Sequence, residues 1–127
     1  MIVGIGTDIV GIERLARLRE ERGDRFLELV FTPAELEHCR KKAGLDERLA
    51  VRFAAKEAAM KALGTGWRKG VHFTQIEVRT GKTGKPQLVL TGEALRRAEA
   101  MGASKIHVSL SHELDNALAV VILENES

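Results

Sequence analysis

The sequence predicts an α+β fold with a largely antiparallel sheet, and two observations support this. Apolar segments that alternate as strands do lie at both ends of the chain, whereas three helical patterns follow one another in the first half. The strands of the second half come in pairs joined by short turns, which makes neighbours antiparallel. The predicted order is strand, three helices, two strands, helix, two strands (β-α-α-α-β-β-α-β-β). We expect residues 1–127 to form one domain.

The composition is that of a globular protein, with 44% hydrophobic and 30% charged residues. A nucleic-acid-binding module would use the arginines of residues 14–25 with Arg68-Lys69, but the net charge of +2 and the 4% aromatic content argue against it. One cysteine, Cys39, excludes an internal disulfide. The longest apolar run, Ala117–Leu123, is too short to span a bilayer, and the N-terminus lacks a basic leader. We therefore expect a cytoplasmic protein without a membrane partner.

Residues 2–12 are predicted to form the first strand. Val3, Ile5 and Ile9 share one face of it, whereas Gly4, Gly6 and Asp8 share the other. Glycines beside Asp8 leave room for something to approach the backbone closely. On the residues alone, Asp8 is better explained as a strand-end or turn aspartate that nearby amides satisfy.

A short helix is predicted over residues 13–22, with Ile12, Leu15 and Leu18 facing inward. Its polar side is rich in arginine, which is typical either of a solvated face or of a docking surface for an acidic partner. These arginines are Arg14, Arg17, Arg19 and Arg22, and Arg25 follows them.

The second helix has a clear start at Thr32-Pro33-Ala34-Glu35. Thr32 is the predicted cap, proline takes the first helical position, and Glu35 completes a capping box. This helix should end at Gly44, and Asp46 should cap the next one.

The third helix ends at Gly64 and contains the segment RFAAKEAAMKALGTG, residues 52–66. It is apolar on nearly every side, which indicates burial. Lys56 falls within its large apolar stripe, and Glu57 and Lys61 lie together at the edge. The simplest explanation of Glu57 and Lys61 is an i,i+4 ion pair on a surface.

The loop after this helix, from Gly64-Thr65-Gly66 to Trp67-Arg68-Lys69-Gly70, combines flexible backbone with a hydroxyl and cations. Such loops can hold phosphate. The second half of the chain is predicted to contain a hairpin with a cationic tip (TGKTGK), a helix and a final hairpin. The predicted elements are strands 73–79 and 87–90, a helix that Thr91 caps and that ends near Met101-Gly102, and strands 104–111 and 117–123.

Four segments, GIGTDIV, RFAAKEAAMKALGTG, TGKP and HVSLSHE, resemble in order and spacing the holo-[acyl-carrier-protein] synthases, over essentially the whole chain. These are the small 4′-phosphopantetheinyl transferases of fatty-acid synthesis. The resemblance implies a 4′-phosphopantetheinyl transferase-like fold. It also implies Mg²⁺-dependent transfer of the phosphopantetheine arm of coenzyme A to a serine of apo-acyl carrier protein, with release of adenosine 3′,5′-bisphosphate. A homotrimer with sites between subunits is expected.

The resemblance also assigns roles to residues. Asp8 and Glu57 should bind Mg²⁺, Lys61 should contact the diphosphate, and the glycines beside Asp8 should admit that diphosphate. The expected catalytic residues are Glu57, Lys61 and His112. The expected cofactor-binding residues are Arg52, Lys56, Lys61, Gly64, Thr65, Gly66, Gly84, Lys85, Pro86, Ser109 and His112. The expected carrier-docking residues are Arg14, Arg17, Arg22 and Arg25.

Several alternatives stay open at this point. The serine proton could pass to a metal-held water, to Glu57 or to His112. Lys56 could serve structure or a cofactor phosphate. By strand parity His112 lies with Ile106, Val108 and Leu110, so it reaches the cofactor only if the strand ends or bulges there. A non-catalytic protein that only binds a carrier would keep the basic helix without needing a metal.

Overall fold

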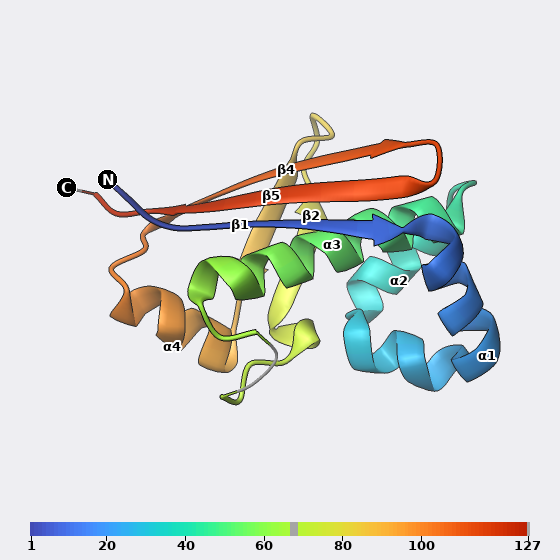
Figure 1. Ribbon diagram of the computed structural model, residues 1–127, viewed down its shortest axis with the longest axis horizontal. Coiled ribbons are helices and arrows are strands. Elements are labelled where there is room, and N and C mark those ends of the chain that lie inside the picture. The colour runs from blue at the N-terminus through green and yellow to red at the C-terminus, as the bar shows by residue number, and fades with distance from the viewer. Residues whose placement is uncertain (67–68, 127) are drawn as a thin grey trace.

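A computed structural model describes residues 1–66 and 69–126, and it confirms the α+β class and the predicted order of elements. The strands form two antiparallel sheets (Figure 1). The larger sheet has the order β1-β5-β4, which is β1 (Ile2–Gly11), β5 (Asn116–Glu124) and β4 (Lys105–Glu113). The smaller sheet is the hairpin of β2 (Ile76–Thr80) and β3 (Pro86–Leu90).

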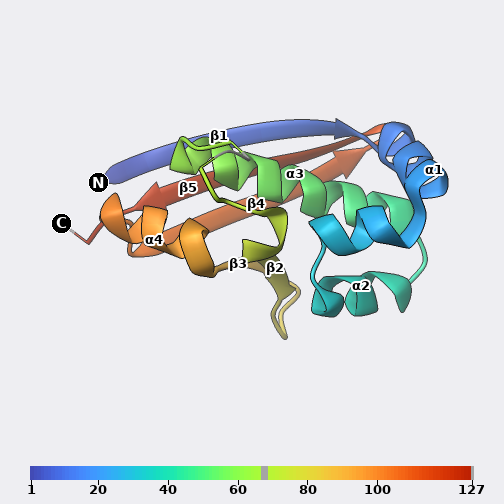
Figure 2. The ribbon, with the colours of Figure 1, turned by 90° about the horizontal axis from the view of Figure 1, so that it is seen from below.

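Helix α3 (Leu45–Leu63) lies along one face of the three-stranded sheet (Figures 1 and 2). The face of β1 that meets it carries Gly4 and Gly6. A methyl group added at Gly6 would overlap the carbonyl oxygen of Ala58, and one at Gly4 would overlap that of Ala62. The glycines therefore let the helix backbone approach the strand. The prediction that they admit a diphosphate is wrong, because α3 fills that space.

The opposite face of this sheet carries exposed aliphatic side chains. Ile5 is 60% exposed, Ile9 64% and Leu118 39%. Within the described residues, no helix packs on this face (Figure 1). Ile5 and Ile9 of β1 thus point away from the core of the chain, whereas Gly4, Gly6 and the buried Val10 point toward that core.

Helix α1 (Ile12–Val30) is longer than predicted. It is kinked at Gly23, whose φ of 66° and ψ of −151° lie in a region that is essentially reserved for glycine. The sequence pattern stops there because a Gly-Asp pair is typical of a helix end. Leu27 and Val30, which are buried beyond the kink, carry the apolar stripe onward.

Helix α2 (Pro33–Arg40) begins as the sequence predicts. The Glu35 amide donates to the Thr32 hydroxyl at 3.2 Å, and the Thr32 amide donates to the Glu35 carboxylate at 2.9 Å. The start of α3 differs from the prediction, because Gly44 and not Asp46 is its N-cap. Asp46 lies in the first turn and accepts two hydrogen bonds from Arg19, at 2.7 and 3.0 Å.

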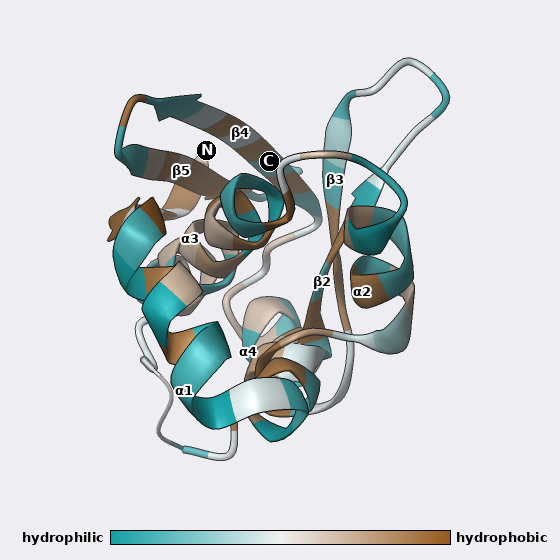
Figure 3. Cartoon of the chain, turned by 90° about the vertical axis from the view of Figure 1, so that its right-hand side faces the viewer, coloured by the Kyte–Doolittle hydropathy of each residue, from teal (hydrophilic) through white to brown (hydrophobic). Residues whose placement is uncertain are grey.

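The second half of the chain follows the predicted order with shifted boundaries. Phe73–Gln75 form a 3₁₀ turn (η1), so β2 begins at Ile76. Helix α4 (Gly92–Ala100) follows the β2–β3 hairpin, whose hydrophilic tip projects from the body (Figure 3). Strand β4 runs beyond its predicted end, and its pairing with β5 is regular from Lys105 to Glu113.

The two chain termini lie side by side at one end of the larger sheet (Figure 1), where the Asn125 amide donates to the Met1 carbonyl at 3.0 Å. In the part of the chain that the structure describes, none of the helices is both long enough and apolar enough to cross a membrane.

Candidate active site

Asp8 of β1 and Lys61 of α3 meet where the strand passes the helix. Asp8 belongs to the glycine face of β1, two residues beyond Gly6, so the close packing of strand and helix brings it to α3. The Lys61 ammonium donates to Asp8 Oδ1 at 3.0 Å and to the Thr7 carbonyl at 2.9 Å. The Asp8 side chain is 11% exposed, whereas that of Lys61 is 56% exposed. The predicted ion pair of Lys61 with Glu57 is therefore replaced by one with Asp8.

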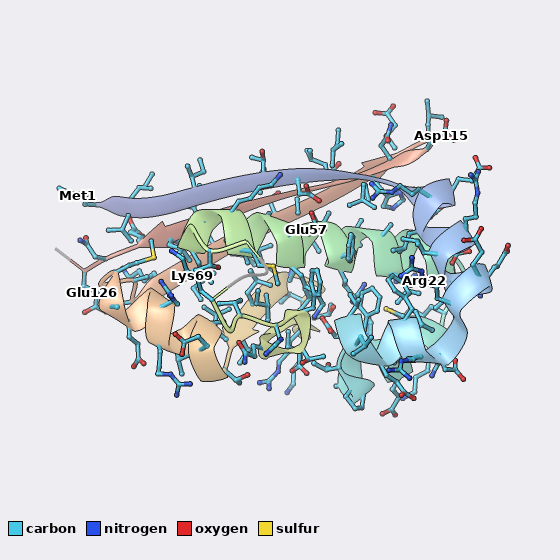
Figure 4. The ribbon with its side chains drawn as sticks, turned by 60° about the horizontal axis from the view of Figure 1, so that its bottom comes forward. Met1, Arg22, Glu57, Lys69, Asp115 and Glu126 are labelled. Carbon is cyan, nitrogen blue, oxygen red and sulfur yellow. The ribbon has the colours of Figure 1, made fainter. Side chains whose placement is uncertain are left out.

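Glu57 lies one helical turn before Lys61, in the middle of α3 beneath β1 (Figure 4). Burial raises the pKa of the Glu57 carboxyl, and the negative charge of Asp8 raises it further. The positive charges of Lys61 and Arg14 act in the opposite direction. Two carboxylates that repel one another at a half-buried site are a suitable ligand pair for a divalent cation, and Mg²⁺ prefers oxygen ligands. Asp8 and Glu57 thus fit the metal that the sequence analysis expects.

Lys56 points away from this site into the protein core. Its side chain is fully buried and pairs with the equally buried Glu35 at 2.7 Å. It also donates to the Phe73 carbonyl at 3.1 Å and to that of Ile76. Burial lowers the pKa of Lys56, and the charge of Glu35 opposes that effect. Of the two roles left open for Lys56, this geometry favours the structural one.

Glu35 is a residue whose role sequence reasoning missed. It was expected only to complete a capping box, which it does. Its second carboxylate oxygen accepts a hydrogen bond from the Val78 amide at 2.8 Å, which links α2 to β2. Its ion pair with Lys56 links α2 to α3. The available signal was the lysine within the apolar stripe of α3, because a buried lysine requires an anionic partner.

A second group of expected residues lines one cavity of about 530 Å³ between β4 and the hairpin tip. It brings together Gly84, Lys85, Pro86, Ser109 and His112, which are distant in the sequence. A smaller cavity of about 140 Å³ adjoins it at the start of α3, because His112 and Arg48 line both. The second cavity also contains Arg52, the remaining cation expected at the cofactor.

The parity predicted for His112 is confirmed. Its pairing with Ala117 continues the regular register of β4, so it shares the face of Val108 and Leu110 without a bulge. The sheet extends past the first turn of α3 there, and His112 Nδ1 lies 3.9 Å from Glu47 Oε2. A continuous strand therefore still brings His112 to the predicted cofactor cavity, because the helix begins beside it.

Two arginines of α3, Arg48 and Arg52, line the cofactor cavities. Arg52 is 5% exposed, donates to the Arg48 carbonyl at 3.1 Å and to the Thr80 hydroxyl at 3.4 Å, and leaves its buried Nε without a hydrogen-bond partner in the described residues. Arg48 was not among the expected residues. Its i,i+4 spacing from Arg52 on a buried helix was the signal that could have identified it.

The loop after α3 lies at the opposite end of the helix from these cavities. Gly64 caps the helix with a φ of 75°, and the Thr65 hydroxyl, which is nearly buried, donates to the Gly66 carbonyl at 2.9 Å. Trp67 and Arg68, part of the predicted phosphate-holding loop, lie outside the described residues.

The two groups of expected residues lie at opposite edges of the sheet. Asp8 is on edge strand β1 and His112 is on edge strand β4, with β5 between them and α3 across the face. Along α3, Glu57 is ten residues from Glu47, the neighbour of His112, which corresponds to roughly 15 Å of helix. The carboxylates and the cofactor cavity are therefore separated within one chain.

The expected docking arginines lie along α1, whose surface is largely hydrophilic (Figure 3). Arg14 is close enough to the carboxylates for its charge to lower the pKa of Glu57. Arg17 pairs with Glu13 at 3.2 Å across an exposed face, as the solvated-face interpretation predicts. Arg22 and Arg25 instead line a hollow of about 340 Å³ together with Phe26 and Leu29.

The chain is similar to known proteins over nearly its whole length. Residues 4–121 match the model of the 4′-phosphopantetheinyl transferase superfamily. Holo-[acyl-carrier-protein] synthases of Solibacter usitatus and Koribacter versatilis are each 48% identical over 125 residues, which is 98% of this chain and 100% of each relative. The chain therefore belongs to the 4′-phosphopantetheinyl transferase superfamily and, within it, to the holo-[acyl-carrier-protein] synthases, so it is a transferase.

Solved structures resemble the chain over almost its whole length. The holo-[acyl-carrier-protein] synthase of Neisseria meningitidis has a TM-score of 0.89 at 42% identity, over 98% of this chain and 100% of that one. That of Bacillus anthracis in complex with coenzyme A (3′,5′-ADP) has a TM-score of 0.80 at 40% identity, over 99% of each chain. The Helicobacter pylori enzyme in complex with coenzyme A has a TM-score of 0.83 at 30% identity, over 94% of this chain and 99% of that one.

Proposed function

We propose that this chain transfers the 4′-phosphopantetheine arm of coenzyme A to a serine of apo-acyl carrier protein in an Mg²⁺-dependent reaction that releases adenosine 3′,5′-bisphosphate. Family membership and the coenzyme A complexes of relatives support the reaction class and the co-substrate. The observation that carries the proposal is the meeting of Asp8, Glu57 and Lys61 where β1 passes α3. The cytoplasm is the expected location.

In this reaction the serine oxygen bonds to the phosphorus that carries the pantetheine arm, and the phosphoanhydride bond to the adenosine phosphate breaks. The adenosine phosphate leaves with the bond electrons, and the serine proton passes to a base. Asp8 and Glu57 would hold Mg²⁺, which when bound supplies charge neutralisation at the diphosphate. Lys61 would stabilise the diphosphate as negative charge builds up on the leaving group. Among the chain's own candidate bases, Glu57 lies at the carboxylate site and His112 lies at the cofactor cavity.

The cavities at β4 support a nucleotide site for coenzyme A. Lys85, Arg48 and Arg52 supply positive charge and donors suited to phosphate, and the turn at Gly84 and Pro86 offers backbone to a base or ribose. The buried Arg52 Nε that has no hydrogen-bond partner in the described residues also favours an anion here, because an orphaned buried donor is costly. Arg48 joins the expected cofactor-binding residues in this proposal.

A homotrimer is supported by two features of the single chain. The carboxylates and the cofactor cavity lie at opposite edges of the sheet, so a neighbouring copy is needed to bring a β4 cavity to a β1 edge. The aliphatic face of the sheet, with Ile5, Ile9 and Leu118, offers an apolar surface for such a neighbour. The proposed active sites therefore lie between subunits.

The experiment that tests this function is mass spectrometry of apo-acyl carrier protein incubated with coenzyme A, Mg²⁺ and this protein. The expected result is a mass gain of roughly 340 Da on the carrier, the mass of the transferred arm. An Asp8→Ala variant should give no gain, because it lacks a proposed metal ligand. An unchanged carrier mass with the wild-type protein would reject the function. Full transfer by Asp8→Ala would reject the site.

A further inference from the structure

The contact between Lys61 and Asp8 raises a question about how a metal enters the proposed site. Asp8 Oδ1 accepts the Lys61 ammonium at 3.0 Å, and the Thr7 carbonyl, another hard oxygen, accepts it at 2.9 Å. These are the same kinds of oxygen that bind Mg²⁺. The ammonium thus already acts as the counter-ion of a carboxylate that is only 11% exposed.

A divalent cation and this ammonium compete for the same carboxylate. A metal on Asp8 Oδ1 would replace the ammonium directly, and a metal on the other oxygen would lie beside it and be repelled. Lys61 has room to move, because its side chain is 56% exposed at the end of a flexible stem. Asp8 and Glu57 come from packed backbone elements and are comparatively fixed.

We propose that Lys61 is an exchangeable counter-ion of Asp8, which a divalent metal displaces and which is thereby released to the diphosphate of coenzyme A. This inference rests on the proposed function, because it requires the metal to bind at Asp8. Lys61 then has opposite effects on two steps. It weakens the binding of the metal alone, and it strengthens the binding of the diphosphate once the metal is in place.

The test measures metal affinity without coenzyme A, with Mn²⁺ as a divalent probe that shares the oxygen-ligand preference of Mg²⁺. The electron paramagnetic resonance signal of free Mn²⁺ gives the Kd. Lys61→Met should bind Mn²⁺ about tenfold more tightly than the wild type, because a neighbouring positive charge has been removed. Lys61→Arg, which keeps the charge, should stay within about twofold of the wild type.

A matched control is Lys41→Met. It removes one positive charge and one ion pair, that of Lys41 with Glu37 at 3.1 Å, at the exposed C-terminal end of α2. Its Mn²⁺ affinity should equal that of the wild type, since the effect requires a charge at Asp8 and not only a lower net charge. Thermal unfolding provides a second measurement. Without metal Lys61→Met should unfold at a lower temperature than the wild type, and Mn²⁺ should raise its Tm more than it raises that of the wild type.

The outcomes separate this inference from the proposed function. If Asp8→Asn abolishes Mn²⁺ binding while Lys61→Met binds no more tightly than the wild type, the counter-ion role is overturned and the metal site stands. If the wild type binds no Mn²⁺, or Asp8→Asn binds it as well as the wild type, the proposed metal site fails and the inference fails with it. Tighter binding by both Lys61→Met and Lys41→Met would also overturn the inference, because net charge alone would explain it.

Discussion

The charged carboxylate of Glu57 destabilises the folded protein when no metal is bound, because it is half-buried and lies near Asp8. Burial raises the pKa of the Glu57 carboxyl above the ordinary value of 4.5, and the negative charge of Asp8 on β1 raises it further. The folded state therefore favours the protonated form. The stability that this form contributes is fully present below the pKa of the unfolded chain and is lost as the pH rises through the folded pKa.

For Glu57→Gln we expect transfer to be abolished while the protein stays folded. Glutamine keeps the shape of the side chain but lacks the charge that a metal requires. With a chelator present, the variant should be more stable than the wild type at neutral pH, and this difference should disappear below about pH 4.5, where both side chains are neutral. Thermal unfolding across pH measures the stability, and the carrier assay measures the transfer. Near wild-type transfer by the variant would make Glu57 a structural residue.

Lys56, the residue before Glu57 in the helix, has a buried charge that is paired within the chain. It is fully buried and its charge is met by Glu35 and by two carbonyl oxygens. Removing one partner of such a pair leaves the other charged and buried, which is more harmful than replacing both.

We predict that Lys56→Met lowers the free energy of unfolding by about 3–5 kcal/mol, because it leaves the Glu35 charge buried and unpaired. A second change, Glu35→Gln, should recover part of this loss, because it removes that charge and keeps an acceptor oxygen for the buried amides of Thr32 and Val78. Urea unfolding of the two single variants and the double variant measures both effects. Additive losses in the double variant would contradict the prediction, since they would mean that the two charges act independently.

At the scale of elements, the contact of β1 with α3 decides where the carboxylates meet. It depends on Gly6, because any side chain there would overlap the Ala58 carbonyl. The strand can approach a helix backbone this closely only without a Cβ atom.

Gly6→Ala should lower the free energy of unfolding by about 3 kcal/mol or more, because the overlap is with backbone and not with a flexible side chain. It should also reduce transfer by displacing Asp8 from α3. The matched control is Gly11→Ala in the same strand, where the added methyl would meet only the Arg14 Cβ at an ordinary 3.7 Å. Chemical denaturation measures the free energy of unfolding of both variants. Equally small losses in the two would show that β1 does not need to approach the α3 backbone this closely.

Helix α1 places positive charge next to the carboxylates. Arg14 acts on Glu57 through its charge, while Arg22 and Arg25 flank an apolar hollow beyond the Gly23 kink. This combination suits an acidic partner that also buries some apolar surface.

Arg14→Glu is expected to raise the KM for acyl carrier protein about tenfold at low salt, with the KM for coenzyme A little changed, because rim charges act mainly on encounter and orientation. Added salt should also raise the KM of the wild type for acyl carrier protein, since exposed charges are screened beyond about 8 Å at physiological ionic strength. Arg96→Glu on α4, where Arg96 pairs with Glu93 on an exposed face, is the charge-matched control. Steady-state kinetics that show an unchanged carrier KM for Arg14→Glu would move the docking surface elsewhere.

At the scale of the whole molecule, one side of the three-stranded sheet packs on α3 and the other is aliphatic and exposed. In the proposed trimer, packing of subunits through that open face would bring the carboxylates of one subunit to the cofactor cavity of another.

We expect Ile9→Glu to convert the protein to smaller species in light scattering coupled to gel filtration, and to reduce transfer strongly. Ile9 is 64% exposed in the single chain, so the change should leave the fold of each subunit intact. The control is Leu95→Glu, which changes an exposed apolar residue of α4 away from this face. This variant should form an assembly of the same mass as the wild type. A wild-type protein that is monomeric and fully active would reject assembly through this sheet.

Local signals in the sequence are sufficient to predict the fold class, the order of the elements and the burial of the third helix. Those features depend on local signals: alternation in the strands, the capping box at Thr32, and an apolar pattern all round residues 52–63. The resemblance of the sequence to one family also predicts roles for Asp8, Glu57 and Lys61. Parity alone correctly assigned His112 to the face of Val108 and Leu110, since the side-chain alternation of a strand is local.

The contacts of each polar residue, in contrast, depend on how the elements pack and could not be predicted from local patterns. The glycines of β1 admit a helix and not a substrate, Lys61 pairs with Asp8 across 53 residues of chain and not with Glu57, and Lys56 pairs with Glu35 in the core. The extension of α1 past Gly23 and the capping of α3 by Gly44 likewise depend on packing. Periodicity states which face of an element a residue occupies, but the partner on that face is set by how elements distant in the sequence pack together.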